Sequence, residues 1–121
     1  MSYDFTNKHV FVSGPIAGEP YFNAEWIDAV KAWLYELGAA TVWTPIALTP
    51  LYGHDEQTHE GYMMPSLHAL TSFYRDEKQR VRRGMDVVVL MPEWAYSEGA
   101  RTEWEVAKAC GIDIVEWEDV A

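Results

Sequence analysis

Two adjoining stretches decide the fold: Val87-Val88-Val89-Leu90-Met91 and, after a short turn, Ser97-Glu98-Gly99-Ala100-Arg101-Thr102-Glu103. A continuous run of apolar, mostly β-branched residues bounded by turn residues is typical of a strand buried on both faces. Ser97 is a favoured N-cap residue, so the second stretch predicts a helix that begins beside the end of that strand. In open α/β sheets ligands bind at this edge, and a helix N-terminus there offers free N–H groups to an anion.

Glu103 is distinguished by its angle on the predicted helix. It shares one stripe with Val106, Ala107 and Cys110, which are all apolar. The spacing therefore predicts that Glu103 points toward the sheet, whereas Glu105 lies on the solvent side. Two interpretations remain open: a carboxylate placed for chemistry beside an anion-binding helix start, or a rim glutamate that caps a neighbouring strand or pairs with an arginine.

Size and composition indicate a single domain over residues 1–121. The chain is 49% apolar and 14% aromatic, which argues against long disorder. Its formal net charge of −10 disfavours non-specific binding to nucleic acid or to an anionic membrane. No apolar stretch is as long as a signal-peptide core or a membrane span, so we expect a cytoplasmic protein. The single Cys110 cannot form an internal disulfide, and its place on the apolar stripe favours a small core residue over a reactive thiol.

The first strand is predicted at His9–Ser13, and it leads into a loop with two glycines and a proline. Glycines directly after a first strand let the backbone approach a ligand, often a phosphate or a sugar. The spacing is neither the dinucleotide fingerprint nor a P-loop, so a tight turn without a ligand is an equal alternative. The candidate ligand-binding residues in this region are Ser13, Gly14, Pro15, Ile16 and Gly18.

Helical periodicity is clearest in the next segment, which predicts an amphipathic helix of about fifteen residues. Gly38 stands where a helix C′ glycine belongs. Asn23, near the start, is either a cap or a further substrate-binding residue. The apolar positions that define the period are Phe22, Trp26, Ala29, Val30, Trp33, Leu34 and Leu37.

The remaining elements complete an alternating order of strands and helices. We predict a short strand over 39–43, a polar loop over 46–65, a helix over 66–84 and a last strand over 112–115. A strand, a helix and a second strand with short connections imply parallel pairing. We therefore expect an α/β fold, a three-layer sandwich with a four- to five-stranded parallel sheet of the flavodoxin or Rossmann type.

Two features in the middle of the chain have both a structural and a functional interpretation. His54, His59 and His68 do not have the HExxH spacing and no cysteine pair accompanies them, so a solvated loop is favoured and no metal site is expected. Four of the nine lysines and arginines fall within residues 78–83. Such a basic stretch is usually a solvated face, but it also suits an oligomer contact or a position near a phosphate.

Three motifs follow one another along residues 9–115: Val12-Ser13-Gly14-Pro15-Ile16-Ala17-Gly18, Asp86-Val87-Val88-Val89-Leu90-Met91-Pro92-Glu93-Trp94 and Ser97-Glu98-Gly99-Ala100-x-x-Glu103-x-x-x-Ala107. Together they resemble the nucleoside 2-deoxyribosyltransferase-like superfamily, above all its small, often phage-borne members of unassigned function. In characterised relatives the glutamate at the place of Glu103 is the nucleophile that attacks C1′ of a nucleoside or nucleotide. The resemblance implies this role for Glu103, and an oxocarbenium-like transition state is stabilised by such a carboxylate.

The resemblance also bears on the substrate. Six residues before that glutamate, nucleoside transferases carry aspartate and nucleotide hydrolases carry serine, and here the residue is Ser97. A serine together with the backbone N–H groups of Gly99 and Ala100 suits a 5′-phosphate. Relatives have a second carboxylate eight residues before the aspartate of the central strand, where this chain has Lys78. Asp76, with Glu77 as the alternative, is the candidate to replace it as a catalytic residue.

The leading hypothesis is N-glycosidic bond cleavage or deoxyribosyl transfer on a nucleoside 5′-monophosphate or a nucleoside. The alternative is a non-catalytic module that binds a nucleotide or an ADP-ribose-like ligand, and a third hypothesis is a structural role in which tryptophans line an oligomer interface. No cofactor is expected. Because relatives commonly pair, the resemblance implies a homodimer or a higher homo-oligomer, without nucleic acid or a membrane as partner.

Overall fold

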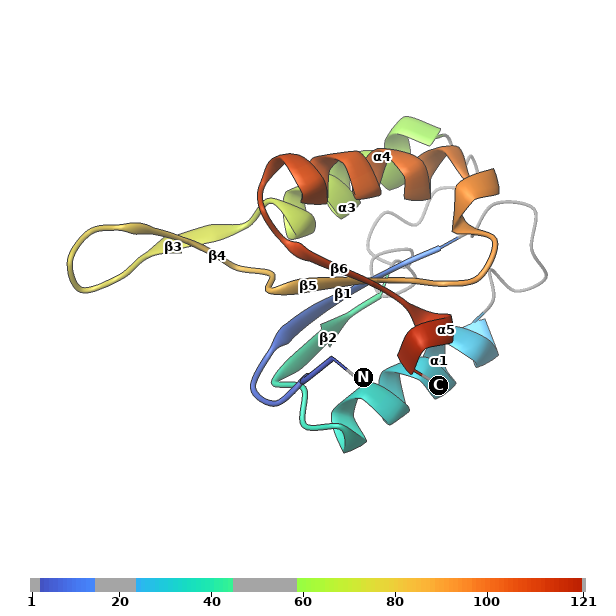
Figure 1. Ribbon diagram of the computed structural model, residues 1–121. Coiled ribbons are helices and arrows are strands. Elements are labelled where there is room, and N and C mark those ends of the chain that lie inside the picture. Colours follow the sequence, from blue (N-terminus) through green and yellow to red (C-terminus); the bar gives the residue numbers. More distant parts are fainter. Residues whose placement is uncertain (1–2, 15–23, 45–58, 121) are drawn as a thin grey trace.

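The structure, a computed structural model, describes residues 3–14, 24–44 and 59–120 (Figure 1). One sheet has the strand order β2-β1-β5-β6, with bounds Thr41–Trp43, His9–Ser13, Val87–Leu90 and Asp113–Glu116. All neighbouring strands in this sheet are parallel. Two further strands, β3 (Phe73–Arg75) and β4 (Val81–Arg83), pair antiparallel in a separate hairpin.

Helices cover both faces of the four-stranded sheet (Figure 1). One face carries α1 (Ala24–Glu36) and α5 (Trp117–Val120), and the other carries α3 (His59–Leu70) and α4 (Glu98–Ala109). A 3₁₀ turn, η3 (Trp94–Tyr96), leads into α4. The predicted α/β three-layer sandwich with a parallel sheet is thus confirmed, with four strands. None of the described helices has the length and apolar character needed to cross a bilayer.

The central strands β1 and β5 divide the core into two clusters because their side chains alternate between the faces. Val10 and Val12 join the cluster beneath α1, whereas Phe11 joins the cluster beneath α3 and α4. Ser13 follows Phe11 by two residues, so its hydroxyl points to the face covered by α3 and α4. Strand β1 therefore ends with a polar group turned toward the layer that contains Glu103.

Helix α1 confirms the predicted helix, although the stripe it buries is rotated from the predicted one. Ile27, Val30 and Leu34 are buried, whereas Trp26 and Trp33 are 39% and 47% exposed. A helix lying on a sheet buries a single stripe, and the i, i+3, i+7 spacing of the three aliphatic residues fits it. The predicted apolar stripe is therefore only partly in the core.

Residues 59–84 differ most from the prediction. The predicted polar loop extended to residue 65, but α3 already begins at His59. The predicted helix over 66–84 was wrong beyond Leu70, because the chain then forms the hairpin of β3 and β4. Lys, Gln, Glu and Arg favour helix in isolation, but a helix here would have no apolar stripe to bury.

The turn between β3 and β4 explains why a hairpin forms instead. The carboxylate of Asp76 accepts hydrogen bonds from the backbone N–H groups of Lys78 and Arg80, at 2.8 and 2.9 Å. Gln79 adopts a left-handed backbone with φ of 65°, which closes the turn. Aspartate commonly forms this kind of local side-chain to backbone bond in turns, where it competes with helix formation.

Cys110 is exposed, so the expectation of a small core residue was wrong. It is the C-cap of α4, and the last buried residue of that helix is Ala107. The apolar stripe of α4 is therefore buried as far as Ala107, and Cys110 at the end of the helix lies outside the core.

Candidate functional site

The carboxyl group of Glu103 lies where β1, α3 and α4 meet. The hydroxyl of Ser13 donates a hydrogen bond to Glu103 Oε1, with an O–O distance of 2.5 Å. The side chain of Ser66, on α3, is hydrogen-bonded to the same carboxyl group. Ser13, Ser66 and Glu103 are 0%, 5% and 6% exposed. Buried polar side chains require partners, and these three residues supply one another.

Helix α4 aims Glu103 inward, as its position on the stripe predicts. Ala100, one turn earlier, and Ala107, one turn later, are buried on the same side of the helix. Their small side chains leave the space beside the sheet to the longer glutamate, so its carboxyl group reaches the end of β1. In the described part of the chain, both ion pairs involve Asp76. No ion pair between Glu103 and an arginine is present among these residues, so that alternative is not supported there.

Burial raises the pKa of Glu103 to about 7, while the hydrogen bonds from Ser13 and Ser66 act in the opposite direction. Loss of water penalises the ionised form, and a donated hydrogen bond favours it. The desolvation is the larger effect here. Near neutral pH both the protonated and the ionised form of the carboxyl group are therefore accessible. A carboxyl poised in this way can serve as a base, an acid or a nucleophile.

Ser66 was missed by the sequence analysis, which treated it only as the first residue of a helix. The structure places it inside α3, four residues before the fully buried Leu70. Residues four apart share a helix face, so Ser66 belongs to the buried face of α3. A serine four residues before a leucine within a predicted helix was the available signal, and the sequence analysis did not use it.

Ser97 caps α4, as predicted. Its backbone is extended, and its hydroxyl oxygen accepts a hydrogen bond from the backbone N–H of Ala100 at 3.2 Å. Because the oxygen acts as an acceptor in the cap, the hydroxyl proton stays free to be donated to another group. This helix start and the Glu103 carboxyl lie on consecutive turns of one helix.

Two glycines assigned to ligand contact have packing reasons of their own. A Cβ atom on Gly14 would lie 2.7 Å from Met91 Cβ, so the chain after β1 passes too close to the end of β5 for a side chain. A Cβ atom on Gly99 would lie 3.1 Å from the sulfur of Met63 on α3. Close packing is therefore a sufficient reason for glycine at both positions.

Asp76 is not brought to Glu103 within one chain. Its carboxylate forms ion pairs with Arg80 at 2.9 Å and Arg82 at 3.0 Å. The hydrogen bond from the backbone N–H of Arg80, followed by those of both arginine side chains, holds the pKa of Asp76 below its usual range. Figure 1 shows the hairpin projecting from the end of the sheet where β5 begins, whereas α4 begins at the opposite end.

The other predicted ligand-binding residues, Pro15, Ile16, Gly18 and Asn23, lie outside the described residues. They belong to a segment that follows directly on Ser13 and Gly14. His54 also lies outside, and His68 is exposed on α3. Among the side chains described, those of residues 3–14, 26–44 and 63–120, no three His, Cys, Asp or Glu gather closely enough to hold a metal ion.

The model of a family described as a domain of unknown function, DUF4406, matches residues 8–116, which include every strand of the central sheet and both helices of the Glu103 site. No curated protein matches the chain. No solved structure matches it either.

Proposed function

We propose that this chain, which belongs to the DUF4406 family, cleaves the N-glycosidic bond of a nucleoside 5′-monophosphate, with Glu103 as the nucleophile. The observation that carries the proposal is the buried carboxyl group of Glu103, held by Ser13 and Ser66 at the carboxyl end of β1. In parallel α/β sheets this edge is where ligands bind. The resemblance of three sequence motifs to nucleoside 2-deoxyribosyltransferases supports the same chemistry.

The proposed reaction consists of two successive substitutions at C1′ of the sugar. A carboxylate oxygen of Glu103 forms a bond to C1′ as the bond between C1′ and the base nitrogen breaks, and the electron pair leaves with the base, which takes up a proton. Water then attacks C1′ of the sugar ester, gives up one proton, which balances the proton taken up by the base, and releases the sugar phosphate and the free carboxylate. When a second base attacks in place of water, the result is transfer.

Burial of Glu103 favours the first step. A carboxylate in a poorly solvated site loses its charge when it becomes an ester, so the desolvation that raises its pKa also raises its tendency to attack. The hydroxyls of Ser13 and Ser66 hold the carboxyl group in one orientation, which reduces the ordering needed to reach the transition state. As a nucleophile, Glu103 acts in its ionised form, so the rate is expected to rise with pH through about 7.

The start of α4 is the proposed phosphate site. The hydroxyl proton of Ser97 is free to be donated, and the first N–H groups of the helix point out of its N-terminus. Glu98 opposes an anion at this place, whereas Arg101 in the same first turns favours one. The net charge of −10 means that binding depends on this local arrangement and not on the overall field.

A panel of nucleoside 5′-monophosphates and nucleosides, followed by chromatography for free base, tests the proposal. We expect base release from at least one nucleotide, and a loss of about 10³-fold or more in Glu103→Gln. Glu105→Gln is the matched control, because Glu105 lies on the same helix but is exposed. Absence of release from the wild type across the panel, or equal release from wild type and Glu103→Gln, would contradict the proposal.

A second candidate function is binding of a nucleotide or an ADP-ribose-like ligand without cleavage. It is favoured by the position of Asp76, since the second carboxylate expected from the resemblance is held in the hairpin by two arginines. Under this alternative, nucleotides raise the melting temperature of the protein but no free base is released. Thermal shift and base release, measured on the same samples, separate the two functions.

A further inference from the structure

The hairpin of β3 and β4, with its turn, forms an arm over residues 73–83 that no other part of the described chain covers. Every residue in its two strands is exposed. Phe73, Tyr74 and Val81 are 66%, 57% and 59% exposed, and all three lie in these two short strands. A two-stranded hairpin with no buried face is marginally stable in water. The arm therefore has the character of a surface that becomes covered in an assembly.

The charge of the arm indicates what covers it. Residues 73–83 contain five of the nine lysines and arginines but two of the nineteen acidic residues. The arm thus carries a formal charge of +3, and the rest of the chain carries −13. A basic, apolar arm on an acidic body is electrostatically complementary to the body of another copy of the same chain.

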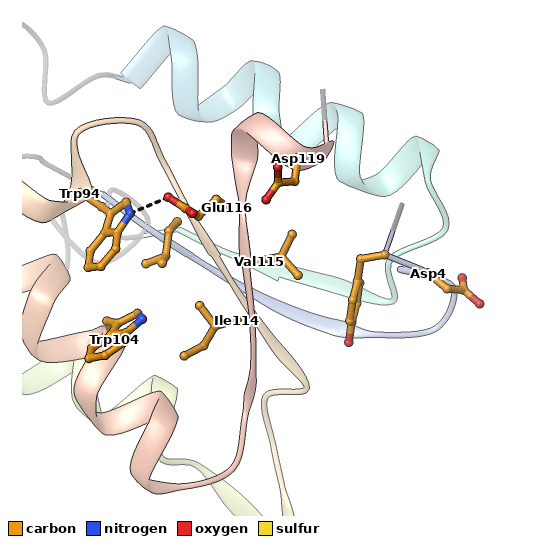
Figure 2. Close-up of a pocket in the computed structure, with 9 residues that line it drawn as sticks. Asp4, Trp94, Trp104, Ile114, Val115, Glu116 and Asp119 are labelled. Atoms are coloured by element: carbon orange, nitrogen blue, oxygen red, sulfur yellow. Dashed lines mark hydrogen bonds between the residues drawn. The ribbon is translucent and has the colours of Figure 1, made fainter. Parts of the chain in front are cut away.

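A groove with matching chemistry runs along β6, at the edge of the sheet (Figure 2). In the described structure β6 pairs with β5 and leaves its other edge free. The cavity has a volume of about 670 Å³, and none of its lining residues is basic. Asp4, Glu116 and Asp119 supply its negative charge, and Trp94, Trp104 and Ile114 supply apolar walls.

The walls of the β6 groove suit arginine and aromatic side chains. Trp94 and Trp104 stack with ring centroids 6.0 Å apart. Trp94 Nε1 donates to Glu116 Oε1 at 3.1 Å, which fixes the carboxylate at the rim and leaves its other oxygen for an incoming donor. The Trp104 ring already lies under Lys108 Nζ, which is 5.0 Å from its centroid, so the indole of Trp94 is the one offered to an incoming cation. A guanidinium group that stacks on Trp94 and bonds to Glu116 gains both interactions.

We propose that the β6 groove receives the arm of a second copy, in a reciprocal dimer. The side chain of Arg83, at the base of the arm, donates to the carbonyl oxygen of Gly111, just before β6 begins. The base of the arm therefore lies beside the beginning of β6, and the residues of β6 and α5 that line the groove follow from Ile114 onward toward the opposite end of the strand. A two-fold axis near the beginning of β6 would lay each arm along the β6 edge of the other copy. Each arm then adds a strand to the partner sheet, and the two equivalent interfaces form together.

Paired charge reversals test the dimer. An arm variant carries Lys78→Glu and Arg80→Glu, and a groove variant carries Glu116→Lys and Asp119→Lys. Sedimentation equilibrium over a concentration series gives the dimer dissociation constant, and we expect each variant alone to raise it by about tenfold or more. When the two variants are mixed, both interfaces of the heterodimer again join opposite charges, so association is restored.

Lys31→Glu on α1 and Glu118→Lys on α5 are matched controls, since they change charge by the same sign outside the arm and the groove. Circular dichroism confirms that each variant is folded before it is mixed. A wild type that stays monomeric, variants that dimerise like the wild type, or a mixture that does not reassociate would overturn the proposal. Binding of a labelled oligonucleotide by the wild type, lost in the arm variant, would overturn it in favour of a nucleic-acid arm.

Discussion

Glu103 is a buried acid whose carboxyl group is held by two hydroxyls and by no cation in the described chain. Hydroxyl groups donate hydrogen bonds but supply no counter-charge, so they offset only part of the lost hydration. The pKa of about 7 expresses that balance. The same balance makes Glu103 a source of pH-dependent instability, which can be measured whether or not the protein is an enzyme.

The first prediction concerns Glu103→Gln. Because the folded-state pKa of Glu103 exceeds its ordinary value of 4.5, its contribution to stability is fully present below pH 4.5 and is lost as the pH rises through about 7. The shift corresponds to about 3 kcal/mol. Urea unfolding at pH 5 and pH 8 should show the wild type losing up to this much free energy of unfolding relative to Glu103→Gln. The control Glu105→Gln should lose the same free energy of unfolding as the wild type between the two pH values. The same result for Glu103→Gln would contradict the raised pKa of Glu103.

The second prediction concerns the hydroxyl of Ser66. Ser66→Ala removes a hydrogen bond that favours the ionised form of Glu103, so the pKa of Glu103 rises further. The carboxyl carbon of Glu103, followed by NMR during a pH titration, reports this pKa directly. The midpoint of base release should move to higher pH in parallel. Ser66→Thr keeps the hydroxyl and should restore the wild-type midpoint, and an unchanged midpoint in Ser66→Ala would refute the role of Ser66.

At the scale of elements, the start of α4 combines a structural and a proposed binding role in one residue, Ser97. Ser97→Ala removes the cap and should lower the free energy of unfolding by about 1 kcal/mol. Ser97→Asp keeps a capping oxygen and adds a negative charge, so stability should be retained while binding of a 5′-phosphate is lost. Calorimetric titration with a nucleotide and with its nucleoside checks this. Equal nucleotide affinity in wild type and Ser97→Asp would exclude a phosphate at this helix start.

The elements also differ in how far the sequence predicts them. Strands β1 and β5 and helix α4 were predicted because strong local periodicity coincides with turn and cap residues, such as Ser97. The arm was predicted as helix because its residue types favour helix in isolation, whereas Asp76 and Gln79 form a turn. The arm buries no face against the rest of the described chain, so no pattern of apolar residues marks its strands. Residue propensities alone therefore predicted the wrong element.

At the scale of the whole molecule, the site depends on contacts between distant segments. The inward direction of Glu103 followed from its helix alone. Ser13 was predicted at the end of β1 as a ligand-binding residue, and its hydrogen bond to Glu103 was not predicted. Ser66 was not predicted either, because its bond to Glu103 requires α3 to pack against α4, which only the assembled layers define. The rotation of α1, which exposes Trp26 and Trp33, is likewise fixed by the sheet and not by the periodicity of the helix.

This division of the molecule into layers leads to the last prediction. Leu34 on α1 and Leu70 on α3 are both fully buried, but they belong to separate clusters on opposite faces of the sheet. Leu34→Ala and Leu70→Ala should each lower the free energy of unfolding by about 2–5 kcal/mol. Because the two residues share no cluster, the losses in the double variant should add within about 0.5 kcal/mol.

The two substitutions should differ at the site. Leu70 shares a cluster with Ala107 of α4, so Leu70→Ala loosens α3 against the helix that holds Glu103. We expect the NMR titration midpoint of Glu103 to shift in Leu70→Ala and to stay at its wild-type value in Leu34→Ala, both measured at a temperature where each variant is folded. Equal shifts would show that the sheet transmits the loss of packing to both faces. The layer of α3 and α4 would then not be the unit that holds the carboxyl group.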